Sequence, residues 1–274
     1  MVQKKILLFK YGGNAMTNST IKKSILANIL ALKKKGYDVV ISHGGGPFIK
    51  DMLTKVNLKT EFIDGLRCTS PEAYIYIEMV LKGQVNSDLV NTINSMGYSA
   101  VGISGKDGKT VVAHKKIHKR EVNGVMQDID LGQVGDVSKV NTPLIYQLLE
   151  NGFIPVVACI GADENGVGYN INGDTFAGYL AGALQADQFI ILTDVDGLLK
   201  DKDDPTSIIR KISLPELHAL KGDGIIQGGM IPKMEACETA INKGARSAKI
   251  INGTQPEQII NINADSIGTL IMKQ

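Results

Sequence analysis

Paired cysteines and long apolar stretches are both missing from this sequence of 274 residues. Cys68, Cys159 and Cys237 are an odd number, lie far apart and form no CxxC motif, which argues against a disulfide framework and a zinc site. We expect three small buried residues, and we identify no metal ligands. No stretch approaches roughly 18 consecutive apolar residues, and the N-terminal residues carry no signal-peptide core. The sequence therefore predicts a cytoplasmic protein that does not enter a membrane.

An excess of charge of one sign is missing as well. Thirty lysines and arginines against 28 aspartates and glutamates give a formal charge of +2, which is too small for a protein that neutralises nucleic acid or lipid headgroups. We therefore expect small-molecule or protein partners, with no nucleic acid and no membrane. The chain is long enough for one large core or for two lobes that share a cleft.

Two common nucleotide-binding signatures are also absent. The segment "GISGKDGKT" ends like a Walker A motif, but five residues separate Gly102 from Gly108 where that motif has four. No GxGxxG follows the first apolar run, and no HRD-type loop with its catalytic base is present. If the protein is a kinase, it belongs to neither the P-loop class nor the protein kinase class.

The sequence does contain an alternation of apolar, strand-like runs with amphipathic segments. The runs are "KILLFK", "YDVVISHGGG", "YSAVGISG", "FIPVVACIG", "QFIILTDVDG" and "SAKIING". Between the first two, Ile25, Ile29 and Leu32 recur at helical spacing before Gly36. This order predicts an α/β fold with a mostly parallel sheet covered on both faces, which binds ligands at the carboxyl ends of its strands. Residues 105–141 are polar and alternating instead, and we interpret them as a β-hairpin insertion over the cleft.

Charged and glycine residues gather where the first two strands end. Lys10 is followed by Gly12 and Gly13, and "SHGGGP" at residues 42–47 places three glycines at a strand-to-helix turn. Glycines let the backbone approach a ligand closely, and a helix start favours an anion. One such turn is more often tight packing, but two on successive strands favour a site in which Lys10 meets an anionic ligand.

Three further segments hold candidate site residues, each with an ordinary structural alternative. Arg67 lies in a short loop, "IDGLRCT", where its fork of donors suits a carboxylate or a structural ion pair equally well. In "GYNINGDTFAGYLAGAL", Asn170, Asn172 and Asp174 could bind a ligand or simply cap the helix. Lys233 in "GGMIPKMEAC" stands at a helix start, against the macrodipole, and therefore requires an anion beside it.

These segments, in this order, resemble the amino acid kinase family. The matching blocks are "FKYGGNAM", "SHGGGPFI", "DGLRCT", "SGKDG", "GYNINGDTFA", "LTDVDGLL", "GGMIPKMEAC" and "IGTLI", and they cover essentially the whole chain. The lysine with glycines and the glycine-rich turn are shared across the family, whereas "GLRxT" and "YNINxD" discriminate between its branches. The resemblance implies an open three-layer αβα sandwich. It further implies an N-terminal lobe of residues 1–185 for acyl-amino-acid binding and dimerisation, and a nucleotide-binding lobe of residues 186–274.

The resemblance also implies roles for individual residues. Lys10 and Lys233 would flank the transferring phosphoryl group, and Asp174 would hold both ammonium groups. The acyl amino acid would contact Gly44, Gly45, Arg67 and Asn170, and the phosphate would contact Gly12, Gly13 and Gly46. The nucleotide would contact Thr193, Asp194, Val195, Gly197, Leu198, Gly229 and Met230.

The implied activity is phosphorylation of the γ-carboxylate of N-acetyl-L-glutamate by ATP with Mg²⁺, by direct in-line transfer, to give an acyl phosphate in arginine biosynthesis. A Glu-like carboxylate is already ionised at neutral pH, so no general base is needed. Positioning and cationic stabilisation must carry the reaction. Two alternatives are a related kinase of another carboxylate, such as carrier-linked aminoadipate, and a non-catalytic sensor. The "RCT" segment argues against the first, and the two lysines argue against the second.

The same resemblance bears on assembly. Family members inhibited by arginine carry an additional N-terminal helix that links dimers into a hexamer, whereas only Met1 to Lys5 precede the first strand here. Residues 70–97 match the family's dimer helix and keep an apolar stripe that includes Ile75, Met79, Leu89 and Ile93, although an ordinary core face is the alternative. We expect a homodimer whose activity is insensitive to arginine.

Overall fold

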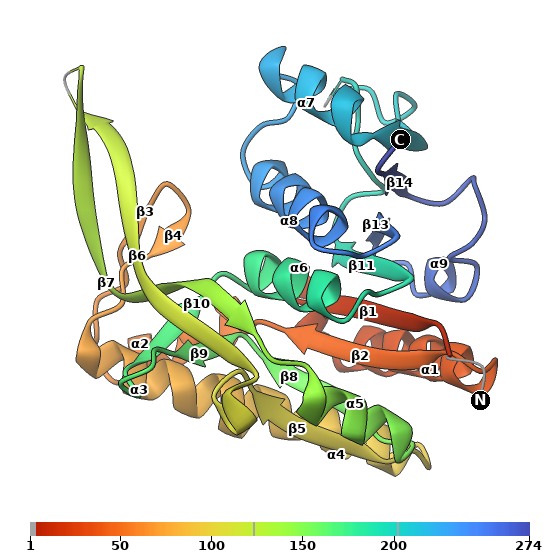
Figure 1. Ribbon diagram of the computed structural model, residues 1–274, viewed down its shortest axis with the longest axis horizontal. Helices are drawn as coiled ribbons and strands as arrows, with labels where there is room; N and C mark the ends of the chain where they lie inside the picture. The colour runs from red at the N-terminus through yellow and green to blue at the C-terminus, as the bar shows by residue number, and fades with distance from the viewer. Residues whose placement is uncertain (1–3, 123, 202) are drawn as a thin grey trace.

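A single eight-stranded sheet forms the centre of the computed structural model, which describes residues 4–122, 124–201 and 203–274 (Figure 1). Its strands run in the order β12 (Lys211–Ser213), β14 (Thr269–Met272), β13 (Ser247–Asn252), β11 (Gln188–Thr193), β1 (Ile6–Tyr11), β2 (Asp38–His43), β8 (Ile154–Ala158) and β5 (Ala100–Ser104). Neighbouring strands are parallel except for the antiparallel pair β13 and β14. The predicted mostly parallel sheet is confirmed.

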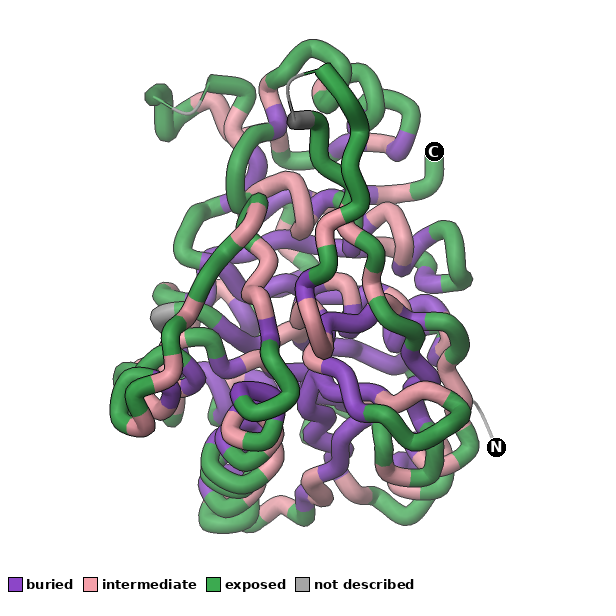
Figure 2. Tube along the Cα trace, turned by 90° about the vertical axis from the view of Figure 1, so that its left-hand side faces the viewer, coloured by how far each residue is buried: buried purple, intermediate pink, exposed green. Residues whose placement is uncertain are grey.

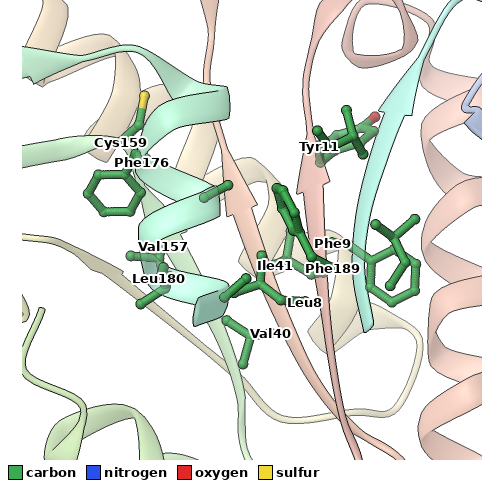
Figure 3. Packing of buried hydrophobic residues seen from close by; sticks show 14 of the residues in the cluster. Leu8, Phe9, Tyr11, Val40, Ile41, Val157, Cys159, Phe176, Leu180 and Phe189 are labelled. Carbon is green, nitrogen blue, oxygen red and sulfur yellow. The ribbon is translucent and has the colours of Figure 1, made fainter. Parts of the chain in front are cut away.

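The central strands are apolar on both faces because helices cover both sides of the sheet. Leu8 of β1 pairs with Val40 of β2 on one side and with Phe189 of β11 on the other. All three side chains are fully buried, and Figure 3 shows them packed together with Ile41 of β2. The carboxyl ends of β1, β2 and β11 therefore lie side by side at one edge of the sheet.

Helices form a layer on each face of the sheet (Figure 1), which confirms the predicted open αβα sandwich. One layer contains α5 (Pro143–Glu150), α6 (Gly173–Ala183) and α8 (Met230–Asn242), and the other contains α1 (Ser19–Lys34), α4 (Ser87–Ser95) and α9 (Glu257–Ile260). Ile25, Ile29 and Leu32 of α1 are buried, as their spacing predicts. The remaining helical segments are η1 (Gly13–Met16), α2 (Gly46–Lys55), α3 (Pro71–Glu78), η2 (Met79–Asn86), η3 (Asp107–Lys109) and α7 (Leu214–Gly222). Within the described ranges, no helix has both the length and the apolar composition needed to span a bilayer.

The insertion predicted at residues 105–141 forms a long β-hairpin. Its strands β6 (Val111–Val122) and β7 (Val125–Val140) are antiparallel, and with β9 (Ile160–Ala162) and β10 (Gly168–Ile171) they close into a small four-stranded barrel. The hairpin rises from the body opposite α7 and α8 in Figure 1, and its outer part is largely exposed in Figure 2. A shorter hairpin, β3 (Phe62–Ile63) and β4 (Leu66–Arg67), lies beside its base.

The segment at residues 70–97 is not one uniform amphipathic helix. The eight residues of η2 form a π-helix between α3 and α4, and the wider π turn changes which side chains face the sheet. Leu89 and Ile93 are buried, whereas Ile75 and Met79 are 53% and 58% exposed. The predicted single stripe is therefore wrong: Leu89 and Ile93 are ordinary core residues, and Ile75 and Met79 form an exposed apolar face.

Helices α6 and α8 pack with their backbones unusually close together. A Cβ atom added to Gly178 of α6 would lie 2.5 Å from the carbonyl oxygen of Ala236 in α8, and one added to Gly182 would lie 2.5 Å from Cβ of Lys243. Any larger residue at these two positions would have to push the helices apart. The small residues of "FAGYLAGAL" therefore fix the distance between α6 and α8.

Candidate functional site

Two lysines and one aspartate meet where β1, α6 and α8 come together. Lys10 lies near the end of β1, Asp174 in the first turn of α6 and Lys233 in the first turn of α8. The Nζ atom of Lys10 lies 2.9 Å from Oδ1 of Asp174, and the Nζ atom of Lys233 lies 3.8 Å from Oδ2. The anion that Lys233 requires at a helix start is thus Asp174. The structure brings together the three residues for which the sequence suggests catalytic roles.

Local hydrogen bonds orient Asp174. The side-chain oxygen of Asn172 accepts hydrogen bonds from the backbone N–H groups of Asp174 and Thr175, at 3.0 and 3.1 Å, and so caps α6. The capping alternative is therefore correct for Asn172, while Asp174 turns to the lysines. Burial tends to raise the pKa of Asp174, but Lys10 and Lys233 outweigh it and hold the pKa below its ordinary value. The carboxylate therefore stays ionised at neutral pH.

The two glycine turns allow close packing around this cluster. A Cβ atom on Gly12 would lie 2.9 Å from Nζ of Lys10, so a larger residue there would displace the end of the Lys10 side chain. A Cβ atom on Gly45 would lie 2.8 Å from Cδ2 of Leu81, which shows that the π-helix η2 presses against the second turn. Gly12 and Gly45 thus allow close packing of neighbouring side chains, and the close approach of a ligand to these turns stays a prediction.

A cavity of about 220 Å³ opens beside the cluster. Every residue for which the sequence implies catalytic, acyl-amino-acid or phosphate contacts, except Lys233, lines it: Lys10, Gly12, Gly13, Gly44, Gly45, Gly46, Arg67, Asn170 and Asp174. Phe62, Cys159 and Asn172 complete part of the wall. We name this space the acceptor cavity.

Arg67 supplies a positive charge to the acceptor cavity. It lies in β4 rather than in a loop, because Asp64 and Gly65, both with positive φ, make a tight turn that pairs β4 with β3. Its guanidinium stacks 4.6 Å from the ring centroid of Phe62 and donates to the hydroxyl of Thr60 at 3.3 Å. Burial alone lowers the pKa of Arg67, and no acidic side chain in the described ranges pairs with it. The structural ion pair is therefore excluded within those ranges, and the charge faces the cavity.

A larger cavity, of about 810 Å³, lies over the loop after β11. Val195, Gly197 and Leu198 of this loop line it together with Met230, the first residue of α8. Lys200, Ile225 and Gln227 line it as well; all three lie between "LTDVDGLL" and "GGMIPK", but no motif singles them out individually. The wall combines apolar side chains with polar ones, as nucleotide and cofactor pockets usually do.

Thr193 and Asp194 belong to a third cavity, of about 180 Å³, which Lys10 and Lys233 also line. Thr254 contributes to the same wall, although no motif in the sequence points to a ligand site at this residue. Its position directly after β13, at the carboxyl edge of the sheet, was the available signal. Gly229 lines neither this cavity nor the 810 Å³ one; it precedes α8, and its carbonyl accepts a hydrogen bond from Lys233.

The cysteines and the Walker-like segment have structural positions. Cys159 and Cys237 are buried free thiols, as expected, but Cys68 is only half-buried. Residues Gly102 to Thr110 lead from β5 through the short 3-10 turn η3 into strand β6 rather than into an α-helix, so the context of a P-loop is absent. Across the described parts of the chain, no three His, Cys, Asp or Glu side chains gather closely enough to hold a metal ion.

The chain is similar to known proteins over nearly its whole length. The model of the amino acid kinase family matches residues 5–252. The acetylglutamate kinase of Methanocaldococcus jannaschii is 43% identical over 98% of this chain and 91% of its own, and that of Heliobacterium modesticaldum is 42% identical over 98% and 92%. Among solved structures, carbamate kinase of Giardia superposes with a TM-score of 0.74 at 20% identity, over 99% of each chain.

Proposed function

Because the chain belongs to the amino acid kinase family, we propose that it is an acetylglutamate kinase. It transfers the γ-phosphoryl group of ATP to the γ-carboxylate of N-acetyl-L-glutamate and so makes the acyl phosphate of arginine biosynthesis. The observation that carries this proposal is the Lys10–Asp174–Lys233 cluster, which lies between the acceptor cavity and the cavities after β11. The relatives named acetylglutamate kinase support the choice of acceptor.

The chemistry requires charge neutralisation rather than proton removal. The acceptor carboxylate is ionised at neutral pH and has no proton to lose. It must instead approach a triphosphate that is also negative, and the charge of the transferring group spreads over its oxygens. Lys10 and Lys233 would neutralise that charge from two sides during in-line transfer. Asp174 would hold both ammonium groups in place, since its depressed pKa and its two lysine partners make it a poor base.

The acceptor cavity suits a small dicarboxylate derivative. Arg67 brings a guanidinium that has no acidic partner among the described residues, and this group is best matched to a carboxylate. Asn170, on β10, would hold the acyl amino acid from the opposite wall, and Gly44 and Gly45 would let it approach the backbone. Gly12, Gly13 and Gly46 would contact the phosphate.

We propose that the nucleotide occupies the cavities after β11. Val195, Gly197, Leu198 and Met230 would surround it in the larger cavity, while Thr193 and Asp194 lie on the side of the two lysines. Gly229 would act by capping Lys233. This assigns acceptor binding to residues 1–185 and nucleotide binding to residues 186–274. Mg²⁺ would enter bound to ATP and neutralise phosphate charge, and the reaction would take place in the cytoplasm.

A coupled assay for ADP release tests the proposed activity. The purified protein is given MgATP with N-acetylglutamate, glutamate, aspartate or carbamate in separate reactions. We expect release to depend on N-acetylglutamate. Release no faster than with ATP alone would refute the catalytic proposal, and faster release with another carboxylate would move the protein to a different branch of the family.

Arg67→Lys should separate the two substrates. Lysine keeps the charge but cannot form two parallel hydrogen bonds to a carboxylate, so the KM for N-acetylglutamate should rise about tenfold or more, as expected for losing one charge-assisted hydrogen bond. The KM for ATP should stay nearly unchanged. Steady-state rates with each substrate varied in turn measure both constants, and equal effects on the two would place Arg67 outside the acceptor site.

We propose that the exposed apolar face of Ile75 and Met79 lies at a two-fold homodimer interface. Met79→Asp should then give a monomer by light scattering, because a carboxylate cannot be buried there without a partner. Met126→Asp is a matched control, since Met126 is 60% exposed on the distant β6–β7 hairpin. A monomeric wild-type protein, or a dimer that survives Met79→Asp, would contradict this interface.

A further inference from the structure

A buried histidine supports the glycine turn after β2 from inside the core. His43 is the last residue of β2 and is 0% exposed. Its Nδ1 atom lies 2.9 Å from the carbonyl oxygen of Gly44. Because a carbonyl oxygen only accepts hydrogen bonds, Nδ1 must carry the proton. The other ring nitrogen, Nε2, lies 2.9 Å from Nδ2 of Asn86, the last residue of the π-helix η2.

Asn86 fixes the protonation state of this ring. Its Nδ2 atom also lies 2.9 Å from the carbonyl oxygen of Val156 on β8, so the amide nitrogen and not the oxygen must point there. The second hydrogen of Nδ2 is donated to Nε2 of His43 at 2.9 Å, since the other acceptor near Nδ2, the carbonyl oxygen of Ile103, is farther away at 3.4 Å. Burial lowers the pKa of His43 to about 4; the hydrogen bond to Gly44 raises the pKa against this effect, and the charge of Lys82 lowers it further. The ring is therefore neutral at neutral pH and protonated on Nδ1.

The carbonyl that His43 holds belongs to the same peptide group as the N–H of Gly45. In a planar trans peptide the C=O and N–H bonds point in opposite directions. A Gly44 carbonyl turned toward the buried ring therefore turns the N–H of Gly45 away from it, on the side of the acceptor cavity that Gly45 lines. Within the described ranges, no protein acceptor takes that N–H, whereas the N–H of Gly44 donates to the carbonyl of Tyr11 at 3.3 Å.

We infer that His43 is a positioning residue for phosphoryl transfer, which aims the N–H of Gly45 at the reacting group through the Gly44 carbonyl. Its hydrogen bond also polarises the shared peptide group, and this makes the Gly45 N–H a stronger donor. The π-helix η2 supports the same turn twice, since Asn86 holds the ring and Leu81 packs against Gly45. The identity of the reacting group rests on the proposed function, but the hydrogen-bond network does not.

Two substitutions of His43 separate positioning from packing. In His43→Asn, the amide nitrogen can take the place of Nδ1 and still donate to Gly44, whereas His43→Leu keeps an apolar volume and donates nothing. Both variants lose the contact with Asn86, so both should lower Tm. Only His43→Leu should lower kcat, by about tenfold, which is less than for losing a direct donor. The KM values of both substrates should change by no more than about twofold, because the effect lies in the transition state.

The tautomer of the wild-type ring gives a test that needs no substitution in the core. Long-range ¹H–¹⁵N spectra of protein labelled on its four histidines distinguish Nδ1–H from Nε2–H, and His43→Asn assigns the signal. We expect a neutral ring with the proton on Nδ1 at pH 7. A proton on Nε2, or equal loss of kcat in the two variants, would overturn the inference. A wild-type protein with the expected tautomer but no turnover of N-acetylglutamate would refute the proposed function and leave the network in place.

Discussion

Lys10→Ala should lower kcat about 100-fold or more, the usual effect of losing one preorganised electrostatic donor. The ammonium group of Lys10 is held 2.9 Å from Asp174, with its side chain only 12% exposed. It lines both the acceptor cavity and the smaller cavity that it shares with Lys233, Thr193 and Asp194. Water that enters after truncation cannot replace a fixed charge between two approaching anions. Lys233→Ala should have an effect of similar size for the same reason.

The matched control is Lys55→Ala. Lys55 lies in α2, is 67% exposed and pairs with Asp51 one helical turn away, so its loss should leave turnover unchanged. ADP release at saturating MgATP and N-acetylglutamate gives the rates. If the turnover of Lys10→Ala stayed within about threefold of the wild type, Lys10 would not be stabilising the transition state.

Asp174→Asn should also lower kcat about 100-fold while leaving the KM for ATP nearly constant. Asparagine keeps the shape of the side chain but removes the charge that holds two ammonium groups together. Their uncompensated repulsion should lower the free energy of unfolding by about 3 kcal/mol, the scale for removing one partner from a buried ion pair. Rates and urea unfolding test both effects. An increase in the KM for ATP alone would reassign Asp174 to nucleotide binding.

The pH dependence of stability gives a second signature of Asp174. Because its pKa is lower in the folded protein than in the unfolded chain, the ionised carboxylate stabilises the fold fully above the ordinary aspartate pKa of about 4. This contribution is lost as the pH falls further, through the depressed native pKa. Asp174→Asn should therefore have a lower free energy of unfolding than the wild type at neutral pH. On acidification, the free energy of unfolding should fall less in this variant than in the wild type. If the difference in free energy of unfolding between the wild type and Asp174→Asn were the same at pH 7 and at pH 3, this would contradict an ionised Asp174 in the cluster.

The parallel sheet and much of the site could be predicted because their signals are local. Apolar runs that end in glycine or a charged residue predict, from the sequence alone, that Lys10 and Gly44 lie at the carboxyl edge of the sheet. The meeting of Asp174 with Lys233 could not be derived from spacing, since it depends on how α6 packs against α8. For that pairing, the family resemblance supplied what periodicity could not.

Other features left no recognisable pattern in the sequence. The π-helix η2 continues the apolar composition of α3, yet it begins at the exposed Met79 and leads into α4, where Leu89 is buried. Thr254 lines the 180 Å³ cavity only because β13 lies beside β11 in the sheet. The order of strands in the sheet is set by the packing of the whole chain, so a short stretch of sequence does not reveal it.

The backbone-to-backbone packing of α6 on α8 has a consequence for how the molecule can move. Asp174 and Lys233 lie on helices with no flexible side-chain layer between them at Gly178 and Gly182. Sliding one helix past the other would drive a Cα hydrogen into a carbonyl oxygen, so we expect the pair to move as one stiff unit. Any hinge that admits substrates or releases products should then lie outside this unit, and amide hydrogen exchange should be slowest along the facing sides of α6 and α8 and faster in the β6–β7 hairpin.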